Sequence, residues 1–103
     1  MVNLRKLDLK GNPNFGMEVS TLEISKCKSL RTIDLTGCNG PTMFTPDISG
    51  CFLLEEFLVS NSSLGSCSFS NNLNLKTIDI TGCTYFTVLD VSNLYKLTSL
   101  SYD

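Results

Sequence analysis

The stretch Leu-Arg-Thr-Ile-Asp-Leu-Thr-Gly-Cys at residues 30–38 decides the fold of this 103-residue chain. Its apolar residues follow the spacing L-x-x-L-x-L, and a small residue closes the unit at the ninth position. The same spacing starts again at residues 4, 54, 75 and 97, so consecutive units lie 21 to 26 residues apart. The ninth position is held by Asn12, Cys38, Ser62 and Cys83. Repetition at this period predicts one stack of similar coils.

A second short motif stands eight residues before each following unit. It begins at Leu22, Pro46, Cys67 and Leu89. Both motifs alternate apolar and polar residues, which is typical of strands with one buried side. Each coil is therefore expected to hold a short strand on each of two faces. The differences in repeat length then fall on one loop edge, between the ninth position and the second motif.

The repeat pattern L-x-x-L-x-L-x-x-N/C resembles the leucine-rich repeat family over essentially the whole chain. It looks like the short bacterial type, found in internalin-like and BspA-like surface proteins, in which a second L-D-L-like strand replaces the helix. The resemblance implies a mostly β, right-handed parallel solenoid of about four and a half coils, with strands on both faces and little or no helix. Three prolines and seven glycines also argue against long helices. Pro46 has no amide to donate, so the second face should be the weaker sheet.

Apolar residues outside the two motifs are expected to complete the core. One inward position should lie three residues before each second motif, at Val19, Met43, Leu64 and Phe86. The loop edge also carries Phe15, Met17, Phe44 and Tyr85, which could form a binding surface or fold down as a lid. The lid is the favoured interpretation.

The five cysteines fall on repeat positions that should be inward or at turns. They are Cys27, Cys38, Cys51, Cys67 and Cys83. The favoured interpretation is that each thiol packs as a small apolar group and donates weakly to turn backbone, as an Asn amide does at the equivalent places. A disulfide between Cys27 and Cys51 is the alternative, although the odd count leaves one thiol over. The chain has no C-x-x-C pair and no His, which disfavours zinc and a cysteine nucleophile.

Side chains at one repeat position should form columns on the outer face of a parallel stack. One column reads Asp8, Asp34, Leu58, Asp79 and Ser101, and the opposite face carries an unbroken serine column at 25, 49, 70 and 92. The aspartates could simply accept hydrogen bonds from nearby amides, form a recognition face, or hold calcium, although no D-x-D-G loop is present. Leu58, an apolar residue among acidic ones, could be a tolerated leucine or the centre of a small hot spot. The candidate partner-binding residues are Asp8, Asp34, Thr36, Glu56, Leu58, Asp79 and Thr81.

Composition narrows the function. With 10 acidic and 8 basic residues the net charge is −2, which fits neither a nucleic-acid surface nor a polybasic membrane patch. Apolar runs are too short for a membrane span, and no signal peptide is seen. Carboxylates spread along a sheet do not converge as an acid and a base do, so no enzyme, metal or cofactor is expected. The expected function is protein binding or adhesion at a bacterial cell surface. The alternative is a structural spacer or self-assembling stack.

Both ends of the sequence lie within the repeat pattern. Residues 1–103 are therefore expected to form one solenoid segment, a fragment of a longer array or a stack with covered ends. Uncapped coils expose apolar side chains and strand edges, which favours self-association. The contacts are expected around Leu4, Leu7 and Leu9, or around Leu97, Leu100 and Tyr102.

Overall fold

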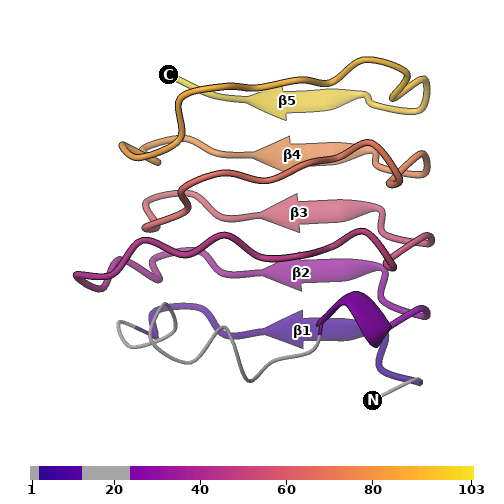
Figure 1. Cartoon of the computed structure of the whole chain (residues 1–103), viewed down its shortest axis with the longest axis horizontal. Coiled ribbons are helices and arrows are strands. Elements are labelled where there is room, and N and C mark those ends of the chain that lie inside the picture. Colours follow the sequence, from indigo (N-terminus) through magenta and orange to yellow (C-terminus); the bar gives the residue numbers. More distant parts are fainter. Residues whose placement is uncertain (1–2, 13–23) are drawn as a thin grey trace.

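The computed structural model describes residues 3–12 and 24–103. Five strands form one parallel sheet in which each strand pairs with its neighbours in sequence (Figure 1). The strands are β1 (Lys6–Asp8), β2 (Thr32–Asp34), β3 (Glu56–Leu58), β4 (Thr77–Asp79) and β5 (Ser99–Ser101). The helix in the described residues is one 3-10 turn, η2 (Ile24–Lys26). The predicted mostly β solenoid with almost no helix is confirmed.

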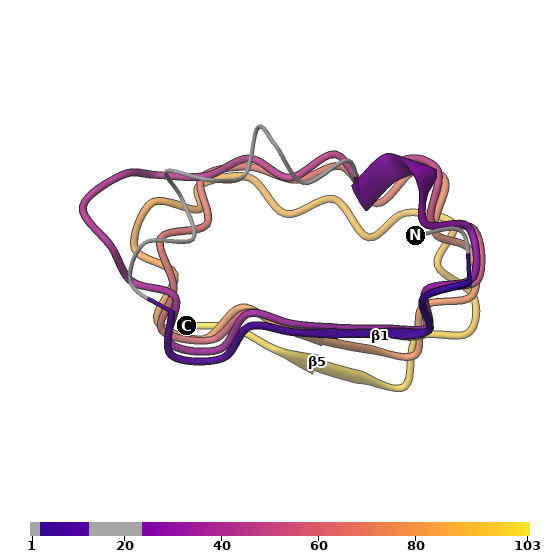
Figure 2. The ribbon, with the colours of Figure 1, turned by 90° about the horizontal axis from the view of Figure 1, so that it is seen from below.

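Each coil is a flattened ring. Figure 2 shows the sheet along one long side of the ring and the second motifs along the other. The strands pair in register, so that Leu7, Ile33, Phe57, Ile78 and Leu100 are successive Cα partners. The molecule measures 33 × 32 × 17 Å, and its thin dimension is short enough for side chains of the two long sides to meet.

The core consists of inward ladders from both long sides. On the sheet side, Ile33, Phe57 and Ile78 are fully buried, as predicted. From the opposite side, Phe69 brings its ring edge against Phe57 at a centroid distance of 5.4 Å. Ile48 is also buried on that side. The two long sides therefore share one apolar layer, whose burial supplies most of the driving force for stacking.

A left-handed residue turns the chain after each of the first four strands. Gly11, Gly37 and Gly82 have φ between 71° and 77°, and Asn61 has φ 53° at the equivalent place. Glycine adopts this conformation without a steric penalty, and asparagine is among the residues that tolerate it best. In the second to fourth coils the next residue, at the ninth repeat position, is buried, whereas Asn12 of the first coil is exposed.

The second face differs from the prediction. Instead of a second set of strands, the described residues form one isolated parallel bridge there, between Phe44 and Leu64. The reason is competition for amides: Ser49 and Ser92 donate their backbone N–H groups to the side chains of Asp47 and Asp90, two residues earlier. Amides bonded within their own segment cannot form a ladder with the neighbouring coil.

The inward position on the loop side is also shifted by one residue in the second coil. Met43, predicted to point inward, is 51% exposed, whereas Phe44 is buried and aligned with Leu64. Phe44 thus belongs to the core itself. Tyr85 is half exposed and does not serve as a lid. Phe15, Met17, Val19 and Leu22 lie outside the described residues.

The first coil is less buried than predicted. Leu7 and Leu9 are only partly buried, although they occupy the same repeat positions as buried residues of the middle coils. The reason is that β1 is an edge strand of the described sheet and packs against a neighbouring strand on one side only.

Buried polar side chains close the gaps between coils. The thiols of Cys38 and Cys83 donate to the carbonyl oxygens of Leu9 and Val59 in the preceding coil, at 3.0 and 3.1 Å. All five cysteines are free; Cys67 is partly buried and the other four are buried. Ser62, which departs from the Asn/Cys pattern, is buried with its hydroxyl 3.5 Å from the thiol of Cys83. The predicted ladder of inward thiols is confirmed.

Asn72 donates to backbone carbonyls of the preceding coil with a side-chain amide in place of a thiol. Its Nδ2 donates to the carbonyl oxygens of Ile48 and Cys51, both at 3.0 Å, and its side chain is fully buried. Cys51 holds the same repeat position one coil earlier and donates from Sγ to Ile24. A single side chain therefore adds a second donor to two turn carbonyls that also accept from the backbone amides of Cys51 and Leu54.

Replacing Asn72 by alanine should lower the free energy of unfolding by about 1–3 kcal/mol, because two buried hydrogen bonds are lost while each carbonyl keeps its backbone amide donor. Asn72→Cys restores one donor of the Cys51 type and should lose less. Urea unfolding measures both values. The control is Asn71→Ala, since Asn71 is exposed and makes one bond to Ser49; its cost should stay below about 1 kcal/mol. Equal losses in the Asn71 and Asn72 alanine variants would contradict this assignment.

Candidate functional site on the outer face of the sheet

In-register pairing brings the predicted recognition residues onto one surface. Asp8, Asp34, Leu58 and Asp79 are successive Cα partners along the sheet. Thr36 and Thr81 follow two residues after Asp34 and Asp79 and are partly buried. The predicted column therefore exists.

The aspartates of this column are largely occupied by their own backbone. The Oδ1 atoms of Asp8, Asp34 and Asp79 each accept from the amide two residues later, at 3.1 to 3.2 Å. Side chains of this type stabilise the turn that ends a strand. Asp34 is only 7% exposed, so it offers little surface to a partner. The predicted role as amide acceptors is confirmed by these contacts.

Lys10 offsets the repulsion between neighbouring aspartates. Its ammonium lies 3.1 Å from Oδ2 of Asp8 and 3.5 Å from Oδ2 of Asp34. The backbone amide and the side chain of Lys10 hold the pKa of Asp8 below its ordinary value, and Asp8 in turn raises the pKa of Lys10. A partner that approached Asp8 would therefore meet a paired carboxylate.

The third coil interrupts this acidic column. Leu58 stands between Asp34 and Asp79 and is partly buried. Next to it, the exposed Glu56 accepts a hydrogen bond from the hydroxyl of Thr32 at 3.1 Å. Glu55 lies 2.8 Å from Arg31 and 3.6 Å from Lys76. Leu58 is thus an apolar group with aspartates beside it on both neighbouring strands and Glu56 two residues before it on its own strand.

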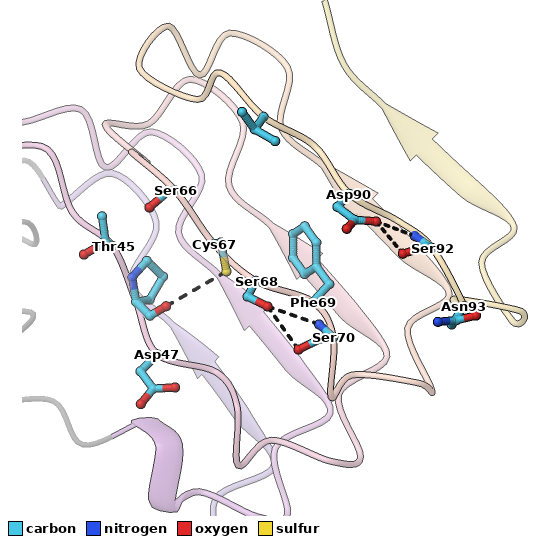
Figure 3. A pocket seen from close by; sticks show the side chains of 12 residues that line it. Thr45, Asp47, Ser66, Cys67, Ser68, Phe69, Ser70, Asp90, Ser92 and Asn93 are labelled. Carbon is cyan, nitrogen blue, oxygen red and sulfur yellow. Dashed lines mark hydrogen bonds between the residues drawn. The ribbon is translucent and has the colours of Figure 1, made fainter.

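A hollow of about 590 Å³ lies on the opposite face, which sequence reasoning did not predict (Figure 3). Figure 2 indicates its origin: the orange segment of the fourth coil lies nearer to the sheet than the coils before it, which leaves a step. Seven of its twelve lining residues carry a hydroxyl or carboxylate group. They are Thr45, Asp47, Ser66, Ser68, Ser70, Asp90 and Ser92. The serine and aspartate columns were visible in the sequence, but the step between coils was not.

Several polar groups of the hollow are hydrogen-bonded within their own segment. The hydroxyl of Ser49 donates to Asp47 at 2.6 Å, and Ser92 bonds Asp90 in the same way. These hydroxyls, followed by the serine amides, hold the pKa of both aspartates below the ordinary value. Both carboxylates therefore stay ionised at neutral pH and cannot serve as general acids.

Cys67 also lines the hollow, but its thiol is not activated. Burial, and secondarily the charge of Asp47, raises the pKa of Cys67 to about 12. Burial likewise raises the pKa of Cys51 to about 11. A cysteine nucleophile needs a lowered pKa, and these environments do the opposite.

Other kinds of site are not supported within residues 3–12 and 24–103. That part of the chain contains no group of three or more acidic or cysteine side chains placed to hold a metal ion. It also contains no helix of the length and apolarity that crossing a bilayer would take. No known protein family, curated protein or solved structure matches this chain.

The thiols should react slowly in the folded protein. At about pH 8, a pKa near 11 leaves Cys51 with about a hundredfold less thiolate than an ordinary cysteine of pKa 9.0 would have. Mass spectrometry after brief iodoacetamide treatment should show little labelling of the native chain. In denaturant without reductant, all five cysteines should be labelled. Labelling of three or of one would mean that disulfides are present.

Ser92→Ala should raise the pKa of Asp90 toward its ordinary value of 3.8, because the strongest bond to the carboxylate is lost. Carboxyl NMR titration measures this directly. Because the pKa is lowered on folding, this contribution to stability is present above about pH 4 and is lost as the pH falls through the folded value. Ser70→Ala is the control, since Ser70 bonds Ser68 and no carboxylate. An unchanged Asp90 pKa in Ser92→Ala would refute the assignment.

Proposed function

We propose that this chain is a protein-binding module of the leucine-rich repeat type, which recognises its partner with the outer face of the sheet. The observation that carries the proposal is Leu58. It replaces an aspartate in a column that is otherwise acidic through the first four coils, and it does so at the middle of the five-stranded sheet. An apolar anchor inside a polar ring is the usual composition of an interface hot spot.

The surroundings of Leu58 support this role because several polar side chains near it are already hydrogen-bonded or ion-paired. Glu56 is held by Thr32, and Glu55 by Arg31 and Lys76. Fixed side chains lose little conformational entropy on binding, so more of the contact energy appears as affinity. Thr36 and Thr81 would provide hydroxyls at the ends of the neighbouring strands, and Asp79 would give this part of the surface a negative charge, whereas Asp8 would be met as an ion pair with Lys10.

The alternative function is a structural spacer. The bonds from backbone amides to Asp8, Asp34 and Asp79 favour it, because carboxylates that serve the chain's own turns need no ligand to explain them. Leu58 remains unexplained by that function. We therefore place the spacer second.

The proposed setting is the surface of a bacterial cell, in a protein of the internalin or BspA type. The support is the resemblance of the repeat pattern to those proteins. Self-association through the end coils is part of the alternative function, since Leu7 and Leu100 are only partly buried.

Selection of random peptides displayed on phage tests the proposed face. Peptides selected on the wild-type chain should bind Leu58→Ser about tenfold or more weakly, because their apolar anchor is lost. Val88→Ser is the matched control: Val88 is 75% exposed but lies on the other side of the ring. Fluorescence anisotropy gives both affinities, and circular dichroism verifies folding.

Two outcomes would overturn the proposal. Selected peptides that bind Leu58→Ser as tightly as the wild type would place recognition elsewhere. A failure to select any peptide above background would favour the structural spacer.

A further inference from the structure

A stacked edge of the solenoid carries exposed apolar side chains that the core does not use. It consists of the four turns 26–31, 50–55, 71–76 and 93–98, which lead from the second face into strands β2 to β5. We call it the basic edge; it lies on the right in Figure 1. The second residue of each turn is buried. These residues are Cys27, Cys51, Asn72 and Leu94. The residue after each of these points to solvent.

Three large apolar residues occupy that outward position in consecutive coils. Phe52 is 51% exposed, Leu73 is 53% exposed and Tyr95 is 88% exposed. Side chains tie the turns together: Nδ2 of Asn74 donates to the carbonyl of Phe52 at 2.9 Å, and the Lys96 ammonium donates to Oδ1 of Asn74 at 2.7 Å. The three residues therefore form an apolar strip, with one residue in each of three consecutive coils. Single apolar residues scattered over a surface do not form such a strip.

Positive charge surrounds the apolar strip. Of the eight basic residues of the chain, five lie in these four turns, against a single acidic one, Glu55. The basic residues are Lys26, Lys28, Arg31, Lys76 and Lys96. Glu55 is contacted by both Arg31 and Lys76, so the local excess of positive charge persists. The described residues outside these turns carry the opposite balance, with three basic and seven acidic side chains.

We propose that the basic edge binds an acidic polypeptide segment that carries leucine or aromatic side chains. Carboxylates of the segment would pair with Lys28 and Lys96, while its apolar side chains cover Phe52, Leu73 and Tyr95. Charge complementarity selects the partner, and apolar burial in the middle holds it. This site goes beyond the proposed recognition face, because Leu58, the anchor of that face, is not part of the basic edge.

Two other occupants fit the edge less well. A second copy of the chain would have to offer acidic groups, but Asp8, Asp34, Asp47, Asp79 and Asp90 already accept bonds from amides of their own segments. A polyanion without apolar groups, such as a sulfated glycan, would leave the strip exposed to water. An acidic segment with apolar side chains matches both the basic side chains and the apolar strip of this edge.

The probe is a short fluorescein-labelled peptide in which glutamate alternates with leucine and phenylalanine. It should bind the wild-type chain, and added salt should weaken the binding because ion pairs contribute. Tyr95→Ala combined with Leu73→Ser should weaken it about tenfold, as should Lys28→Glu combined with Lys96→Glu. These positions are exposed, so folding should persist, and circular dichroism verifies it. Tyr85→Ala, a half-exposed tyrosine on the opposite edge, and Leu58→Ser are controls that should leave the affinity unchanged.

Several results would overturn the inference. These are no binding at millimolar peptide, equal weakening by Tyr85→Ala, or equal binding of a peptide in which serine replaces the leucine and phenylalanine. Heparin could instead bind as tightly as the peptide. If Lys28→Glu with Lys96→Glu weakened heparin binding and Tyr95→Ala with Leu73→Ser did not, the edge would be assigned to polyanions. Sedimentation showing a dimer that Tyr95→Ala dissociates would assign it to a second copy. Because Leu58→Ser is a control here, failure of this site leaves the proposed function intact, and the reverse also holds.

Discussion

In-register hydrogen bonding between consecutive coils sets the height of each turn of this solenoid at the strand spacing, about 4.8 Å. Five strands of only three residues could not form a stable sheet alone. They persist because their central residues Ile33, Phe57 and Ile78 are fully buried, and Phe57 packs against Phe69 of the other long side. Any residue that disturbs the register would move a whole ladder out of the core.

Close stacking leaves turn carbonyls that strand pairing cannot satisfy. Small inward donors bond these carbonyls: the thiols of Cys38 and Cys83 bond Leu9 and Val59. Cys51 and Asn72 add a second donor to carbonyls that also accept from turn amides. A thiol is a weak donor but packs as an apolar group, whereas an amide reaches two carbonyls at once. This explains why cysteine and asparagine share repeat positions, and why burial leaves the thiols poorly reactive.

Much of the sheet side could be predicted from the sequence because every inward position repeats at constant spacing from the leading leucine. Ile33, Phe57 and the inward cysteines follow from that spacing. The second face could not be predicted in the same way, because the side chains of Asp47 and Asp90 compete for backbone amides that strands would need. The shift from Met43 to Phe44 arises in a loop of variable length, where spacing carries no information. The hollow beside Cys67 depends on an offset between coils, which exists only in three dimensions.

The direction of the hydrogen bonds has a mechanical consequence. The bonds that join β1 to β5 run along the axis of the stack, and each coil contacts only its neighbours. When a force pulls the two ends of the stack apart, the interfaces between coils bear it in series. They can therefore separate one at a time. Such a molecule would lengthen in steps of one coil at low force rather than rupture as a unit. The same chain pulled parallel to its strands would load the hydrogen bonds of a strand pair together, in shear.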